Sequence, residues 1–213
     1  MLSFAAAASM TAMLAGSPDP SAQRAAELPT VTIGVHTAPA ISPVVVDKTL
    51  EEASAIWRPT GVTFKWQKID AESVSAAAQP TRPRVIITEE PGRPSTGGAP
   101  IGWVTFVDDE PDGDIHVSHA NAERYILSFG GLPGGTRRLT PAERFLLMGR
   151  TLGRALAHEI GHYLLRSKAH TTNGLMKANR TVKEFTDADA RGFEVDTTER
   201  EAVVRRVRQI TES

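Results

Sequence analysis

The sequence predicts an α+β domain in which a twisted mixed β-sheet packs on one long helix, with a small helical part at the C-terminus. Several short stretches in the N-terminal half have the alternating or continuous apolar pattern of strands. A helical pattern of roughly 25 residues then runs without a break from 140 to about 165. The chain has 213 residues, of which 40% are hydrophobic, enough for one domain with a real core.

The N-terminal segment is set apart from this domain by its composition. Residues 2–16 are apolar or small and uncharged, and a polar stretch with two prolines follows at 17–22. This pattern resembles the apolar core and cleavage zone of a secretory signal peptide, although no Lys or Arg precedes the apolar run. We therefore assign 1–26 to a signal peptide or a disordered N-terminal segment, and 27–213 to a single domain. A signal peptide would make the protein secreted or periplasmic.

The strands are expected where apolar residues alternate with polar ones, as Val31, Ile33 and Val35 do. Gly- and Pro-rich stretches, such as the one at 91–100, are expected to be loops. The polar stretch 67–83 is expected to be a loop with a helical turn. The acidic stretch 108–114 is expected to be a turn. The expected strands cover 28–37, 62–66, 84–88, 101–107 and 115–118, and the expected shorter helices cover 46–57 and 120–129.

The long helix has the clearest start signal in the chain. Thr140 is a good N-cap, Pro141 suits the first helical position, and Glu143 completes a capping box. At 1.5 Å per residue the helix would be about 37 Å long. Because Leu and Ala surround much of it, we expect it to cross the middle of the domain. A last helix beginning at Thr197 has only a modest apolar face and is expected to serve packing.

Composition excludes several kinds of site. The net charge is −1 and the pI is about 6.6, so nothing indicates a nucleic-acid partner. The apolar N-terminal run is too short for a stable membrane span. The chain has no cysteine, which excludes disulfides, thiolate metal sites and a cysteine nucleophile. A transition-metal site would have to use His, Asp and Glu, and three of the six histidines fall within 158–170.

The run 158–162 (His-Glu-Ile-Gly-His) lies inside the long helix. His158 and His162 are four residues apart, so their rings lie on one face and can converge on one metal. Glu159 is rotated by about 100° and could take a proton from water activated by that metal. The alternative is that all three are buried, hydrogen-bonded side chains, which would be costly without a metal.

A catalytic zinc usually has three protein ligands and one open position. The downstream candidates for the third ligand are His170, Glu184 and Glu194. We favour His170, because a chain that leaves the helix near residue 166 and turns back can bring it under the metal.

These residues carry a resemblance to a known family. The run 158–162, followed by His170 and then Gly174, Leu175 and Met176, resembles the zincin superfamily of metallopeptidases and is most similar to the metzincin type. The resemblance covers residues 157–177. It implies a zincin-like domain, one Zn²⁺ per chain held by His158, His162 and His170, and Glu159 as general base, with Met176 as the turn methionine.

The spacing departs from the metzincin pattern. Metzincins have a Gly three residues after the second His and the third His three residues later, where this chain has Leu165 and Lys168. His170 therefore comes two residues late, and the turn between the second and third ligands must be built differently.

The function predicted from this motif is a zinc-dependent peptidase that cleaves peptide or protein substrates, with Glu159 as the base. One alternative is a non-catalytic zinc-binding module, which would not need Glu159. The other is a zinc hydrolase of non-peptide amides or esters, which the sequence does not distinguish from a peptidase.

In zincins an edge strand binds the substrate backbone. The candidates for it are 101–107, which would bring Gly102 and Trp103 near the cleft, and 115–118. A second metal site formed by His116 and His119 with acidic neighbours, or a calcium site in the acidic turn, is less favoured than a solvated turn.

Overall fold

The computed structural model describes residues 28–76, 82–91, 99–128 and 139–212. The expected signal peptide and the expected connection at 130–135 lie outside these ranges. Among the described residues, no helix combines the length and the apolar character that crossing a membrane requires.

A mixed sheet of five strands forms one layer of the molecule, in the order β2-β1-β3-β5-β4. The first four of these run parallel, and β4 pairs antiparallel with β5 at the edge. The strands are β1 (Val31–Thr37), β2 (Phe64–Lys68), β3 (Arg84–Thr88), β4 (Gly102–Val107) and β5 (Glu110–Ser118).

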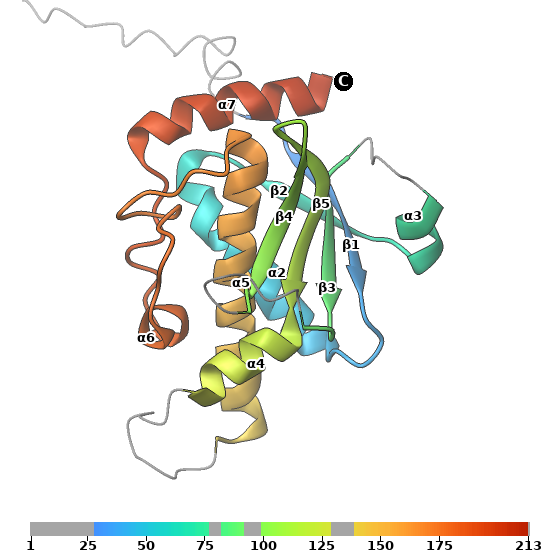
Figure 1. Cartoon of the computed structure of the whole chain (residues 1–213), viewed down its shortest axis with the longest axis vertical. Helices are drawn as coiled ribbons and strands as arrows, with labels where there is room; N and C mark the ends of the chain where they lie inside the picture. Colours follow the sequence, from blue (N-terminus) through green and yellow to red (C-terminus); the bar gives the residue numbers. More distant parts are fainter. Residues whose placement is uncertain (1–27, 77–81, 92–98, 129–138, 213) are drawn as a thin grey trace, which may run out of the picture.

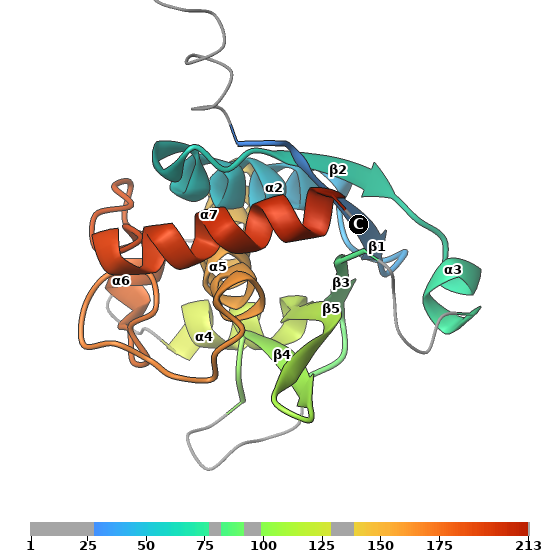
Figure 2. The same ribbon diagram turned by 90° about the horizontal axis from the view of Figure 1, so that it is seen from above.

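Helices α2, α4, α5, α6 and α7 lie on one side of the sheet, where α5 and α2 are side by side, whereas α3 lies on the other side (Figures 1 and 2). Figure 2 shows α7 crossing over α5. The helices are α2 (Pro43–Trp57), α3 (Ala71–Ala76), α4 (His119–Ser128), α5 (Pro141–Leu165), α6 (Val182–Thr186) and α7 (Thr197–Glu212), with a 3-10 turn at Arg58–Thr60.

Helix α5 is the long helix predicted from the sequence. The Thr140 side chain accepts the backbone N–H of Glu143, and the Glu143 carboxylate accepts that of Thr140, so the capping box is formed. Almost every residue from Met148 to Leu164 is buried. The helix therefore runs through the middle of the domain, as expected.

Close packing joins α2 and α5. A Cβ atom on Gly153 would lie 2.7 Å from the backbone oxygen of Thr49, so only glycine fits there. One residue before the histidine motif, the Ala157 carbonyl accepts a hydrogen bond of 3.1 Å from the indole N–H of Trp57 on α2. These contacts fix the part of α5 that carries the motif.

The acidic stretch 108–114 is not one turn, which corrects the sequence-based expectation. Only Asp108 and Asp109 form the turn, both with positive φ (51° and 64°), as a two-residue hairpin connection requires. Strand β5 already begins at Glu110, because Val107 pairs with Glu110 and Phe106 with Pro111 across the hairpin. The strand expected at 115–118 is therefore nine residues long.

Strand β5 is also an interior strand, with β3 on one side and β4 on the other. It cannot offer a free edge to a substrate. Of the two candidates for an edge strand, only β4 lies at the edge of the sheet.

Candidate metal centre

Three histidine side chains gather beside α5. The Nε2 atom of His162 lies 3.1 Å from Nε2 of His158 and 3.2 Å from Nε2 of His170. Their candidate ligand atoms all lie within 4.8 Å of one another, and no other such group of three His, Asp or Glu residues occurs in the described part of the chain.

The turn that brings His170 back begins where α5 ends. Arg166 adopts the left-handed conformation with φ of 51° and reverses the chain. Arg166 then pairs with Glu110, and the Lys168 amine binds the Asp109 carboxylate at 2.7 Å. Both contacts tie this turn to the β4–β5 hairpin, and the turn accommodates the two extra residues before His170.

The two histidines of α5 present their Nε2 lone pairs to the same point. The Nδ1–H of His158 donates to the Leu175 carbonyl at 2.8 Å, and the Nδ1–H of His162 donates to the Ser167 carbonyl at 2.7 Å. A carbonyl oxygen can only accept a hydrogen bond, so each Nδ1 carries the proton. In the neutral ring each Nε2 is then unprotonated and has a lone pair available for a metal.

The electrostatics of the site also favour neutral rings. Burial lowers the pKa of His158 to about 4, and burial is also the main cause that lowers the pKa of His162. Lone pairs facing each other at 3.1 Å repel unless a cation lies between them. Tetrahedral zinc with Zn–N bonds of about 2.0–2.1 Å separates its nitrogen ligands by about 3.3 Å, so the three imidazoles fit this ion.

Glu159 lies beside the histidines and against the edge strand. Its residue is 8% exposed, and burial raises the pKa of its carboxyl group to about 8. A Cβ on Gly102 of β4 would lie 2.7 Å from Cγ of Glu159. The absence of a side chain at Gly102 therefore makes room for the carboxylate.

Met176, which the resemblance suggests as the turn methionine, packs against the motif at Gly161. It is 1% exposed, and its sulfur atom occupies the space in front of Gly161 where any side chain would clash. Gly174, two residues before Met176, has φ of +66°, a value that glycine adopts easily and that allows the chain to turn there. Met176 thus supports the helix between His158 and His162.

A cleft of about 760 Å³ opens over the histidines. Strand β4 forms one wall, where Gly102 and Trp103 lie as expected. The rest of the lining has no sequence motif and was not predicted, since its residues come from α4 and from the irregular chain between α5 and α7. It includes Tyr125, Lys177, Ala178, Asn179, Arg180, Phe185 and Phe193.

The other candidate ligands have different partners. The Glu184 carboxylate binds Lys177 at 2.8 Å and caps α6 through Thr181. Glu194 accepts the backbone N–H of Gly192 at 2.8 Å. Neither glutamate belongs to the histidine cluster.

The suggested second metal site does not form either. His116 stacks on Trp103 with ring centroids 4.9 Å apart, whereas His119 lies 3.5 Å from Glu89. The carboxylate of Asp114 pairs with Arg84 at 2.7 Å.

Comparison with known proteins identifies the fold. No model of a known protein family matches the sequence, and no curated protein sequence matches it. Archaemetzincin from Methanopyrus kandleri has a similar structure, with 14% identity over 84% of this chain and 96% of that chain, and a TM-score of 0.50. Myroilysin is a more distant structural match, with 15% identity over 73% of this chain and 57% of that chain, and a TM-score of 0.30.

The archaemetzincin similarity confirms the fold class predicted from the sequence. The chain has a zincin-like α+β fold, in which a mixed sheet packs on the long helix that carries the histidine pair. The chain therefore resembles zincins in its fold as well as in its histidine motif.

Proposed function

We propose that the protein is a zinc-dependent peptidase that hydrolyses peptide bonds. One observation carries this proposal: the imidazole nitrogens of His158, His162 and His170 converge beside the buried carboxylate of Glu159, in a cleft open to a substrate. The zincin-like fold supports it, because zincins, which the sequence resembles, carry a similar motif on the long helix of this fold.

In the proposed site, His158, His162 and His170 would hold one Zn²⁺ per chain. The cluster would supply three protein ligands, as many as catalytic zinc sites use, and all three histidines line the cleft. When bound, zinc would supply Lewis-acid chemistry, polarising a carbonyl and lowering the pKa of water.

The protein's own groups carry out the proton transfers. The positive charge of bound zinc would lower the pKa that burial raises, so that Glu159 is ionised in the loaded site. Its carboxylate would then accept a proton from the attacking water and deliver it to the leaving amine. Its buried position against Gly102 holds the carboxylate next to the histidines and limits its contact with bulk solvent.

Strand β4 provides the place for an extended substrate. It is the edge strand of the sheet and forms one wall of the cleft, so a peptide can add to it as a further strand. This feature favours a peptide substrate over a small non-peptide amide or ester.

Substitution of the proposed base tests the chemistry. Glu159→Gln keeps the shape of the side chain but cannot accept the proton, so we expect hydrolysis of a cleaved peptide to fall by about 10²–10⁴-fold. Zinc content, measured by atomic emission, should remain that of the wild type. The matched control Glu201→Gln removes an exposed carboxylate from α7 and should change neither quantity.

Full peptidase activity in Glu159→Gln would refute the proposed mechanism. If the wild type cleaves esters but no peptide, and Glu159→Gln loses the ester activity, the protein is a hydrolase of non-peptide substrates. If a folded, zinc-loaded wild type cleaves neither, the non-catalytic zinc-binding module is the correct function.

A further inference from the structure

The chain between α5 and α7 carries both His170 and the carbonyl that orients His158. In this stretch, 166–196, α6 is the only helix, and regular backbone hydrogen bonding is sparse. Side chains must therefore hold much of its backbone in place. The carbonyl of Leu175 matters most, because it accepts the Nδ1–H of His158 at 2.8 Å.

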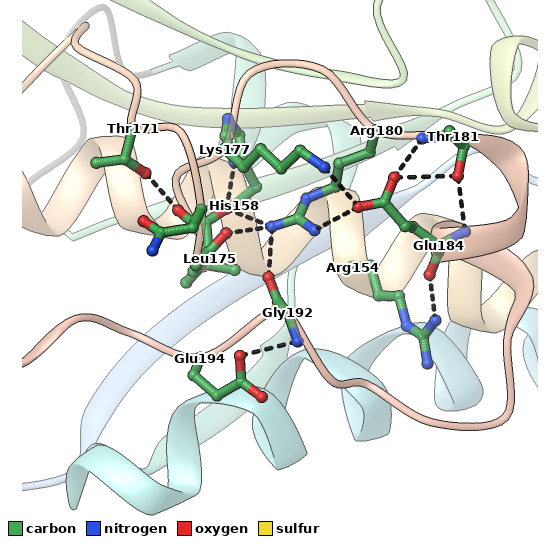
Figure 3. Close-up of polar contacts among 12 residues, drawn as sticks. Arg154, His158, Thr171, Leu175, Lys177, Arg180, Thr181, Glu184, Gly192 and Glu194 are labelled. Carbon is green, nitrogen blue, oxygen red and sulfur yellow. Dashed lines mark hydrogen bonds and ion pairs between the residues drawn. The ribbon is translucent and has the colours of Figure 1, made fainter.

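Arg180 contacts this carbonyl and two others. Its side chain is only 3% exposed. Its Nη2 atom donates to the carbonyls of Gly174, Gly192 and Leu175, the last two at 2.7 and 3.4 Å (Figure 3). One guanidinium thus joins the turn after His170 to the irregular chain that leads to α7.

The Arg180 side chain is itself held from several directions. Its guanidinium lies 3.8 Å from the centre of the Phe193 ring, and Nη1 lies 3.6 Å from the Glu184 carboxylate. The Tyr125 hydroxyl, on α4, donates to the Arg180 carbonyl. These contacts leave the guanidinium little freedom, so it can act as a fixed point for the carbonyls it binds.

We propose that Arg180 is a positioning residue for the metal centre. By fixing the Leu175 carbonyl, Arg180 fixes the tautomer and ring orientation of His158, and through them the affinity of the three-histidine site for its metal. Such partners behind a ligand commonly change metal affinity about 10–100-fold when they are removed. The inference rests on the proposed zinc site.

A second buried arginine provides the contrast that tests this role. Arg154 lies on α5, is fully buried, and binds Glu52 at 2.8 Å. It also donates to the Glu184 carbonyl at 2.6 Å (Figure 3). Its guanidinium also faces the Phe193 ring, 5.1 Å from its centre. Arg154 therefore holds the same stretch of chain, but its hydrogen bonds go to residues other than Leu175.

The test compares zinc affinity across matched arginine variants of the full chain. Affinity is measured by competition with a chromophoric chelator, well below the melting temperature of each variant. We expect Arg180→Ala to weaken zinc binding about 10–100-fold. Arg180→Lys, which replaces the planar fork with a single nitrogen, should be intermediate. Arg154→Ala should lower the melting temperature but bind zinc within about two-fold of the wild type, as should Arg191→Ala, an exposed arginine of the same stretch.

The absorption spectrum of the Co²⁺-substituted protein reports on the geometry of the metal ligands. A variant that only loses stability should keep the wild-type spectrum. The spectrum should change in Arg180→Ala, because the His158 ring is reoriented, and stay constant in Arg154→Ala. Unchanged zinc affinity and spectrum in Arg180→Ala would overturn the inference, as would an equal loss of affinity in Arg154→Ala.

If Arg180→Ala does not fold, Arg180→Lys decides the question, and wild-type affinity and spectrum in that variant would overturn the inference. A wild type that binds no zinc would instead overturn the proposed function and this inference together. A wild type that binds zinc but cleaves no peptide would leave the positioning role intact.

Discussion

Glu159 on α5 packs directly against Gly102 on the edge strand β4. A methyl group on Gly102 would lie 2.7 Å from Cγ and 3.2 Å from Oε1 of Glu159. It would also lie 3.1 Å from the backbone oxygen of His116, which cannot move aside easily. The carboxylate therefore keeps its place only because residue 102 has no side chain.

This contact predicts that Gly102→Ala displaces the Glu159 carboxylate. Peptidase activity should fall by at least about ten-fold, since a displacement of about 1 Å in a catalytic group can cost that much or more. Zinc content should not change. The matched control is Gly34→Ala on β1, where the new methyl would meet the side chains of Ile69 at 3.1 and 3.3 Å and of Arg84 at 3.6 Å, but no backbone atom. Equal activity in both variants would show that Gly102 does not position Glu159.

At the same scale, the sequence predicted His158 and His162 from local geometry and favoured His170 without specifying the turn that brings it back. It did not predict Arg180. The spacing of His158 and His162 determines their common face on any helix. The approach of His170 depends on the left-handed Arg166 and on contacts with a distant hairpin. The role of Arg180 rests on three carbonyls of an irregular chain, and no periodic pattern marks it.

Helix α5 combines a strong start signal with glycines where it meets α2. Gly153 faces the backbone of α2, with the Thr49 oxygen 2.7 Å from the position of a Cβ. Helices can approach this closely only where a side chain is absent from the contact. The α2–α5 contact in turn supports the residues just before the histidine motif through Trp57.

The close contact predicts that Gly153→Ala destabilises the protein despite the better helix propensity of alanine. Overpacking should cost about 1–3 kcal/mol, against a gain of up to about 1 kcal/mol from propensity. Chemical denaturation of the metal-free protein measures the net change. Arg144→Ala, on the exposed first turn of the same helix, should have little effect. A stabilised Gly153→Ala would show that the two helices can separate freely.

Among the elements, α5 was predictable because its cap, its length and its periodicity agree. The extent of β5 was not, because its first residues are charged and polar and lie in a hairpin that projects from the sheet. Its pairing with β4 is a long-range contact, which composition does not reveal. The interior position of β5 followed from the strand order, which no single segment encodes.

For the whole molecule, the apolar core and the proposed metal centre are separate parts of the structure. The buried core joins the sheet, α2, α5 and α7 through residues such as Val85, Ile115, Leu152 and Val203. The histidines lie at the margin of this core, beside the cleft. We therefore expect the protein to fold without metal and to gain further stability when zinc binds.

Zinc at about 100 times its dissociation constant should stabilise the fold by about 2.7 kcal/mol, which corresponds to a rise in melting temperature of about 5–10 °C for a chain of this size. Calorimetry of chelator-treated and zinc-loaded protein measures the rise. His158→Ala should abolish most of it without unfolding the protein. A chelator-treated protein that lacks cooperative melting would show that folding itself needs the metal.

The central claim is that His158, His162 and His170 together hold one zinc ion, and zinc content tests it most directly. Wild type and His170→Ala are purified side by side, and zinc per chain is measured after dialysis against metal-free buffer. We expect one zinc per wild-type chain and a lost or greatly weakened site in His170→Ala. An undiminished zinc content in His170→Ala would contradict the claim and transfer the third ligand to Glu184 or Glu194.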